Sequence, residues 1–203
     1  FASDIDKATK GIIGKLRRRG EFEAKVGQTA YIATNDGTSA ERIFLVGLGK
    51  SSKKLSAEDL DKISSAITSG LTAKKSSNGV VCLPDKKFES ENSSLNALLQ
   101  KLGTALESST YTYDAKLNKK NKKVNYLKKV SILLESTQKI SELRKSLKTG
   151  QCIGQGMNAA KDLANLPGNV CTPSYLASTS RTASRNYQNL SCKVFGEKEM
   201  KKM

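Results

Sequence analysis

A helix that ends at a proline turn, within residues 150–176, constrains the fold of this chain more than any other feature. Apolar residues recur there at spacings of three and four, so they share one helix face. The members of this stripe are Ile153, Met157, Ala160 and either Leu163 or Ala164. Gly150 and Gly154 lie one turn apart beside it. Because glycine lowers helix propensity, we expect the pair to serve a close contact with another backbone.

Prolines mark the end of this helix and the start of the next. Pro167 disfavours helical geometry in the residue before it, and the Pro-Gly-Asn sequence then turns the chain. Thr172 is a typical N-cap, and Pro173 suits the first position of a helix. The sequence therefore predicts two helices joined by a short loop, as a joint between two folded units.

Helices and short apolar strands alternate along the rest of the chain. We expect helices over residues 4–19, 56–74, 93–106, 137–166 and 173–187, and strands over residues 28–34, 42–48, 80–83, 124–134 and 190–195. This alternation predicts an α/β fold, a sheet flanked by helices. The run over residues 42–48 is almost continuously apolar, which is typical of a strand that is buried on both faces.

The sequence offers little material for a catalytic or metal site. It contains no histidine, and its four cysteines form no paired metal motif. Asp59 and Asp61 do not share a face of their predicted helix. Val-Gly-Leu-Gly-Lys at residues 46–50 lacks the four-residue spacing between glycines of a phosphate-binding loop, so we interpret it as a glycine turn. We predict no catalytic residue and no metal ligand in this chain.

A lysine segment over residues 116–129 is the strongest electrostatic feature. It contains no acidic residue, and the whole chain has a formal net charge of +16. Such a segment can attract polyanions, and the candidate contacts are Lys119, Lys120, Lys122 and Lys123. The favoured alternative is a solvated loop whose lysines protect an edge strand from aggregation, because Tyr126 alone is no stacking platform for bases. A basic α/β module that binds nucleic acid remains the second hypothesis.

The joint also carries a family resemblance. Residues 158–177, NAAKDLANLPGNVCTPSYLA, resemble a segment of the leucine aminopeptidases, the cytosolic aminopeptidases that use two metal ions. Residues 16–29 and 41–50 add supporting matches in the same order. The resemblance implies an N-terminal, non-catalytic α/β domain over residues 1–136, with a mixed sheet similar to that of macro domains. It also implies an interdomain helix over residues 137–166 and the beginning of the catalytic domain over residues 167–203.

The same resemblance implies a function for the longer protein. Family members remove N-terminal amino acids, preferably Leu, from peptides, with two divalent ions such as zinc or manganese. They assemble as homohexamers in the cytoplasm, and some bacterial relatives also bind DNA. We expect this chain to be a piece that binds no metal itself and serves assembly and regulation, with the catalytic residues beyond Met203. No apolar run reaches the eighteen or so residues of a membrane span. The similarity to macro domains adds ADP-ribose binding as a third hypothesis, which rests on fold analogy alone.

Overall fold

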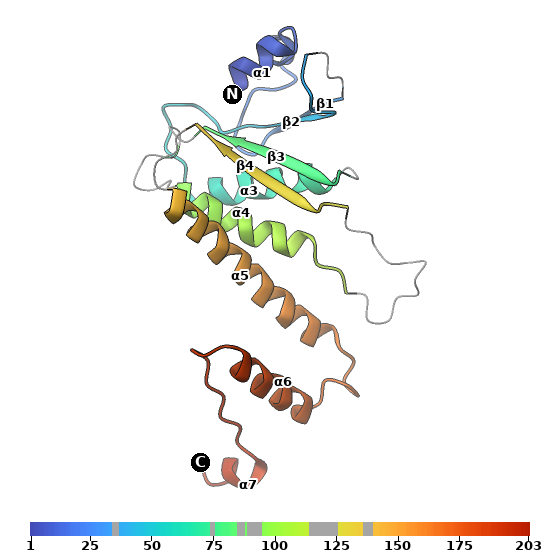
Figure 1. Ribbon diagram of the computed structural model, residues 1–203, viewed down its shortest axis with the longest axis vertical. Helices are drawn as coiled ribbons and strands as arrows, with labels where there is room; N and C mark the ends of the chain where they lie inside the picture. Colours follow the sequence, from blue (N-terminus) through green and yellow to red (C-terminus); the bar gives the residue numbers. More distant parts are fainter. Residues whose placement is uncertain (34–36, 74–75, 85–87, 89–94, 114–125, 136–139) are drawn as a thin grey trace. The chain divides into compact units, whose positions relative to one another are not determined.

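The computed structural model forms two compact units, residues 1–157 and residues 158–203 (Figure 1). It describes residues 1–33, 37–73, 76–84, 88, 95–113, 126–135 and 140–203. Helix α5, Ile140–Asn165, begins in the first unit and ends in the second. The helix predicted over residues 137–166 is therefore continuous through Gly150 in its described part, and the division between the units falls inside it.

The first unit begins with two short helices in place of the single helix predicted over residues 4–19. Helix α1 spans Ala2–Ala8 and helix α2 spans Ile12–Arg18. Between them Lys10 and Gly11 have φ angles of 54° and 78°, which are left-handed values that a continuing α-helix cannot contain. The prediction of one helix is wrong at this point.

The side chain of Asp6 explains why the second helix begins so soon after the first ends. Its Oδ1 atom accepts hydrogen bonds from the backbone N–H groups of Ile13 and Gly14, at 2.8 and 3.1 Å. The first N–H groups of a helix lack partners within it, and Asp6 supplies an acceptor from the helix before. The apolar stripe continues across the break, since Ile13 packs with Ile32 and Ile43 in a small core cluster.

The strands of the described chain form two small sheets with opposite pairing (Figure 1). Strand β1, Thr29–Ile32, pairs antiparallel with β2, Ile43–Val46. Strand β3, Asn78–Leu83, pairs parallel with β4, Lys129–Leu134. The predicted α/β fold, with mixed strand pairing and helices around the strands, is confirmed.

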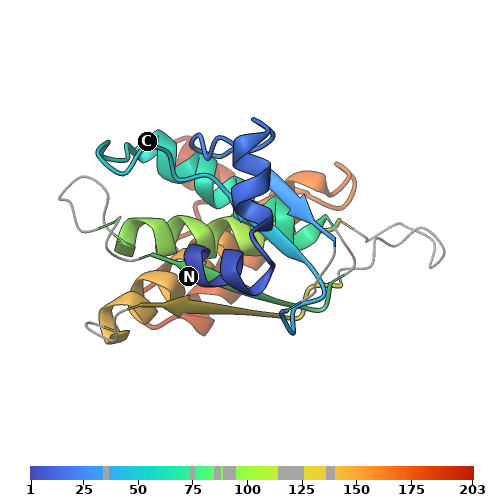
Figure 2. The same cartoon turned by 90° about the horizontal axis from the view of Figure 1, so that it is seen from above.

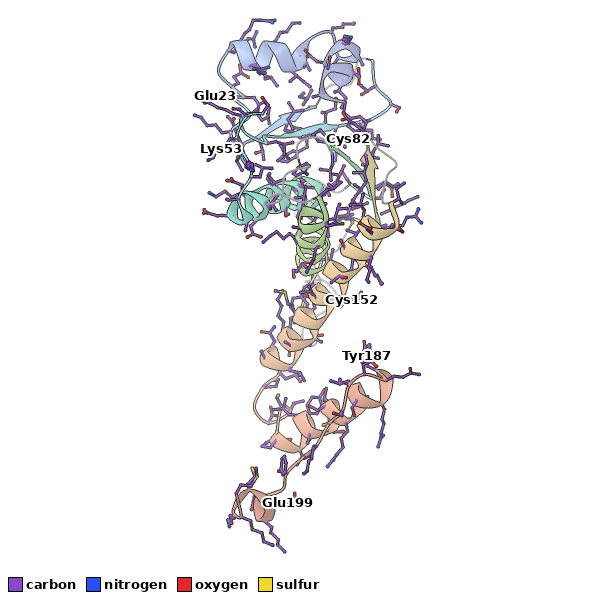
Figure 3. All side chains as sticks on the ribbon, turned by 90° about the vertical axis from the view of Figure 1, so that its left-hand side faces the viewer. Glu23, Lys53, Cys82, Cys152, Tyr187 and Glu199 are labelled. Atoms are coloured by element: carbon purple, nitrogen blue, oxygen red, sulfur yellow. The ribbon has the colours of Figure 1, made fainter. Side chains whose placement is uncertain are left out.

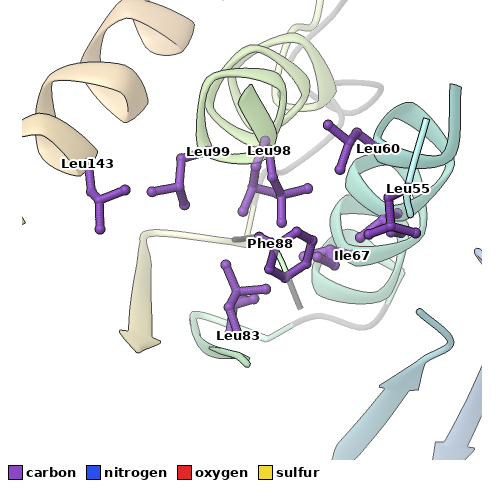
Figure 4. Close-up of a cluster of buried hydrophobic side chains, with 11 residues drawn as sticks. Leu55, Leu60, Ile67, Leu83, Phe88, Leu98, Leu99 and Leu143 are labelled. Carbon is purple, nitrogen blue, oxygen red and sulfur yellow. The ribbon is translucent and has the colours of Figure 1, made fainter. Parts of the chain in front are cut away.

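Helices α3, Ala57–Thr72, and α4, Leu95–Ser109, pack against each other and supply much of the main core (Figure 2). A capping box begins α3: the Ser56 hydroxyl accepts from the Asp59 N–H at 3.1 Å, and the Ser56 N–H donates to the Asp59 carboxylate at 3.0 Å. The core residues contributed by these helices, by β3 and by α5 are Leu60, Ile63, Ile67, Leu98, Leu99, Leu102, Val81, Leu83 and Leu143 (Figure 4).

Both small sheets have exposed apolar side chains, although the apolar run over residues 42–48 predicted a strand buried on both faces. Phe44 of β2 is 36% exposed, and Val80 of β3 is 65% exposed. Strand β3 turns Val81 and Leu83 into the core, while Val80 and Cys82, which alternate with them, are more exposed. This alternation belongs to a sheet with one packed face, so burial on both faces is not observed in the described chain.

The second unit contains the end of α5, helix α6, Pro173–Asn186, and a last turn α7, Glu197–Met200. None of its residues is buried. The strand predicted over residues 190–195 is absent, because a strand is defined by hydrogen bonds to a neighbour and this unit holds no other strand. No helix of the described chain is both long and apolar enough to cross a membrane.

Candidate functional site

Acidic side chains in the first unit serve helix ends and helix pairing. The backbone N–H of Ser56 donates to the Asp59 carboxylate, and this hydrogen bond holds the pKa of Asp59 below its usual value. Asp61 pairs instead with Lys101 of α4. Within the described residues, no group of three His, Cys, Asp or Glu side chains could hold a metal ion. The residues present therefore do not fit a dinuclear metal centre.

All four cysteines are free thiols. Cys82 lies on β3 and Cys152 is exposed on α5 (Figure 3). Burial raises the pKa of Cys82, which disfavours the reactive thiolate. The chain contains no histidine, the base that most often activates a nucleophilic cysteine.

The glycine turn after β2 has its backbone donors already in use. The Gly47 N–H donates to the carbonyl of Gln28 at 2.7 Å, and the Gly49 N–H donates to the carbonyl of Ala24 at 2.8 Å. A Cβ atom on Gly47 would lie 2.0 Å from the carbonyl oxygen of Lys25. A phosphate loop needs free N–H groups, whereas these glycines make room for the segment before β1. The interpretation as a structural glycine turn is confirmed.

The four lysines of the candidate polyanion contact lie outside the described residues; they are Lys119, Lys120, Lys122 and Lys123. The described end of the same segment is exposed at Lys128 and Lys129, whose N–H groups donate to the Ser77 carbonyl at 2.8 and 3.2 Å. These bonds tie the segment to the start of β3. Polyanion binding by the four lysines stays a prediction.

The joint after α5 follows the sequence prediction residue by residue. The N–H groups of Val170 and Cys171 both donate to the Pro167 carbonyl, at 2.8 and 2.9 Å. Helix α6 then begins where the Thr172 hydroxyl accepts from the Tyr175 N–H at 3.3 Å. The proline stop, the tight turn and the threonine cap are all confirmed.

Two of the three glycines of α5, Gly150 and Gly154, are buried against α4, as their spacing predicted. A Cβ atom on Gly150 would lie 2.0 Å from the carbonyl oxygen of Gln100. A Cβ atom on Gly154 would lie 2.5 Å from the Cβ of Glu107. Since real Cβ atoms do not approach other atoms this closely, only glycine fits at either position. The apolar stripe beside them is exposed instead, with Ile153 at 42% and Met157 at 45%.

A groove of about 740 Å³ between α3 and α4 was not predicted. Its α3 wall is made of hydroxyl side chains at helix spacing, namely Ser64, Ser65, Thr68, Ser69 and Thr72. Among its described lining residues the acidic and basic side chains are Asp61 and Lys101, which pair with each other. The repeat of hydroxyl residues in α3 is the sequence signal that could have revealed it. The groove offers neither a general base nor a metal ligand set.

Comparison with known proteins identifies a protein family, which the chemistry of the described residues does not. Residues 1–120 match the N-terminal domain of the cytosol aminopeptidase family. This chain belongs to the cytosol aminopeptidase family. The resemblance found in residues 158–177 is thereby confirmed at the level of the family.

Two curated relatives show how far the similarity extends. A probable cytosol aminopeptidase of Nitrosococcus oceani is 32% identical over 203 residues, which are 100% of this chain and 40% of that protein. One from Azoarcus is 34% identical over 193 residues, which are 92% of this chain and 37% of that protein. The chain thus spans about two fifths of the length of these cytosol aminopeptidase relatives.

Solved structures show the same fold. A mutant of tomato leucine aminopeptidase matches 98% of this chain and 38% of its own, with a TM-score of 0.77 and 22% identity. The bottromycin maturation enzyme BotP in complex with Mn matches 93% of this chain and 36% of its own, with a TM-score of 0.65 and 20% identity. At this level of identity the likeness establishes the fold of the aminopeptidase N-terminal region.

Proposed function

We propose that this chain is the N-terminal part of a metal-dependent leucyl aminopeptidase, which removes N-terminal amino acids, preferably Leu, from peptides. The match of residues 1–120 to the family's N-terminal domain carries the proposal. Two divalent ions, zinc or manganese, would polarise the peptide carbonyl and activate water in the full-length enzyme. The described residues of this chain do not fit such a centre, and the proposal assigns its ligands to the part of the family's length that this chain does not span.

In this proposal the chain contributes assembly and regulation. Residues 1–136 form the non-catalytic domain, residues 137–166 the interdomain helix, and residues 167–203 the start of the catalytic domain. Support comes from α5, which runs from one compact unit into the other. The full-length protein would act as a cytoplasmic homohexamer, and its sedimentation should report a hexamer without the addition of any ligand.

Activity assays on two proteins test the proposal. The full-length protein, loaded with manganese or zinc, should hydrolyse leucine p-nitroanilide and lose this activity in a chelator. The chain of residues 1–203 should be inactive at every metal concentration, because its described residues bring no ligand set together. Chelator-sensitive turnover by purified residues 1–203 would overturn the assignment of catalysis to the missing part.

Nucleic-acid binding is the second candidate, favoured by the net charge of +16 and by the lysine segment. Each phosphate contact contributes about 0.9 to the slope of log affinity against log salt. Replacement of all four candidate lysines by Gln should therefore lower the slope for duplex DNA by up to about 3.6. A control with four exposed lysines elsewhere, Lys54, Lys198, Lys201 and Lys202, removes the same charge. Equal slopes for both variants, or no binding at physiological salt, would contradict a specific role for this segment.

A further inference from the structure

Helix α5 crosses the boundary between the two units, which falls after Met157. Whatever holds the first half of α5 therefore also determines where its second half begins. In the first unit that contact is with α4, and glycines from both helices form it.

The glycine contact is reciprocal. Gly150 of α5 lies against the Gln100 carbonyl of α4, as described above. In turn, a Cβ atom on Gly103 of α4 would lie 2.6 Å from the Leu147 carbonyl oxygen and 3.0 Å from the Gln151 nitrogen of α5. Each helix thus presents a glycine to the backbone of the other. Such a contact allows little sliding, because any side chain that moved into it would overlap backbone atoms.

Hydrogen bonds fix the same pair of helices along their length. The Thr104 hydroxyl of α4 lies 3.0 Å from the Gly150 carbonyl of α5 and 3.0 Å from the Gln100 carbonyl of its own helix, so its one proton is shared between these two acceptors. One turn earlier on α5, the Ser146 hydroxyl donates to the Asn96 side-chain oxygen at 3.0 Å. A hydroxyl that bonds a helix carbonyl selects one rotation of that helix, so these bonds add orientation to the close approach.

We propose that the interlocked glycines Gly103, Gly150 and Gly154 act as a positioning device, which fixes the axial position and rotation of α5 and so sets where the protein after Asn158 is held. This inference rests on the proposed role of α5 as an interdomain helix. It adds the particular contact that performs the role, and that contact lies wholly within the first unit.

Gly156 provides a matched control in the same helix. A Cβ atom there would meet no atom within 4 Å, so Gly156→Ala changes helix propensity without touching α4. The new methyl group of Gly150→Ala would instead lie 2.0 Å from the Gln100 carbonyl oxygen, whereas an ordinary contact needs at least 3.4 Å. Helix α5 must shift or rotate against α4 to allow this.

The test measures distances between spin labels in the full-length protein. Labels are placed at Ser65→Cys on α3 and Ser180→Cys on α6, both exposed, after replacement of the native cysteines. Gly150→Ala and Gly154→Ala should shift or broaden the distance distribution, whereas Gly156→Ala should leave it as in the parent. Ile63→Val, a core change on α3, should lower the thermal midpoint without moving the distribution.

An unchanged distance distribution in Gly150→Ala and Gly154→Ala, with a lowered thermal midpoint, would overturn the inference and leave the glycines a merely stabilising role. If these variants do not fold, Thr104→Val removes the hydrogen bond to Gly150 at nearly constant volume. It should broaden the distribution, and a distribution like that of the parent would again overturn the inference. The measurement does not use activity, so it decides the inference independently of the assays that test the proposed function.

Discussion

The two units of the chain contain equally well-formed helices but differ in what holds those helices in place. Every buried hydrophobic side chain of the described structure lies between Ile13 and Leu143, inside the first unit. The second unit has capped helices and a defined turn, yet no buried residue. Caps and turns therefore determine where helices begin and end in both units. We expect the first unit to be the more stable one, because it contains the buried side chains.

Typical free-energy contributions of burial and of helix caps support this difference between the units. A fully buried Leu or Ile contributes about 1.5–3 kcal/mol relative to an exposed one, whereas a helix cap contributes about 1 kcal/mol. The first unit has its cluster of buried side chains on α3, α4, α5 and β3. In the second unit Tyr175, Leu176 and Leu190 remain 41%, 42% and 48% exposed.

Separation of the units should give the largest effect. Residues 158–203 alone should be mostly unfolded by circular dichroism, because isolated helices shorter than about 12–15 residues are marginal in water. Residues 1–157 should show a cooperative thermal transition. A cooperative transition in the isolated fragment 158–203 would contradict the view that its helices are unstable because they bury no side chains of their own.

Single truncations of leucine should repeat the comparison within residues 1–203. Leu98 is 0% exposed in the core, and Leu98→Ala should lower the unfolding free energy by about 2–5 kcal/mol. Leu176 is 42% exposed on α6, and Leu176→Ala should change it by no more than about 0.5 kcal/mol. Because the chain contains no tryptophan, urea titrations followed by circular dichroism measure both changes in unfolding free energy. Similar losses for the two variants would remove the distinction between the units.

Glycine substitutions sharpen the comparison inside α5. Gly154→Leu in the full-length protein should lower stability by about 1–3 kcal/mol or more, because the side chain overfills the contact with α4, and should loosen the assembly. Gly156→Ala should raise stability by up to about 1 kcal/mol, since the site is open and Ala favours helix. Thermal midpoints and sedimentation of Gly154→Ala, Gly154→Leu and Gly156→Ala report both effects. Higher midpoints for both Gly154 variants, with the oligomer unchanged, would mean that Gly154 is not packed.

These contrasts also explain how much the sequence could predict. Signals that act over a few residues predicted the structure correctly, as the helix stop, the turn and the threonine cap around Pro167 show. The spacing of Gly150 and Gly154 predicted a close contact, because two glycines on one helix face have few other uses.

The errors concern features that depend on distant neighbours or on side-chain detail. The break between α1 and α2 is capped by Asp6, seven residues before its partner Ile13, while the apolar stripe continues across it. Openness of the sheet faces at Phe44 and Val80 depends on what lies beside the strands. The strand expected over residues 190–195 lacks a partner strand in its own unit. No local pattern contains this information.

The smallest expected effect is a difference between two helix caps in how their contributions to stability depend on pH. At α3 the capping box includes the Asp59 carboxylate, whose pKa is lowered by the hydrogen bond from the Ser56 N–H. At α6 the cap is the Thr172 hydroxyl, which does not titrate. A carboxylate with a lowered pKa in the folded state stabilises that state above its unfolded pKa, here the usual value of 3.8, and this stabilisation is lost as the pH falls through the folded pKa.

The difference in unfolding free energy between the parent and Asp59→Asn should therefore be constant above a pH of about 5 and should shrink below it. The difference between the parent and Thr172→Ala should stay the same across this range, because no proton is exchanged at that cap. Urea unfolding of residues 1–203 at pH 7 and at low pH, for all three proteins, measures both differences. An Asp59→Asn difference that is the same at both pH values would show that the carboxylate adds nothing to the cap beyond its neutral hydrogen bond, and the two units would then begin their helices by the same uncharged means.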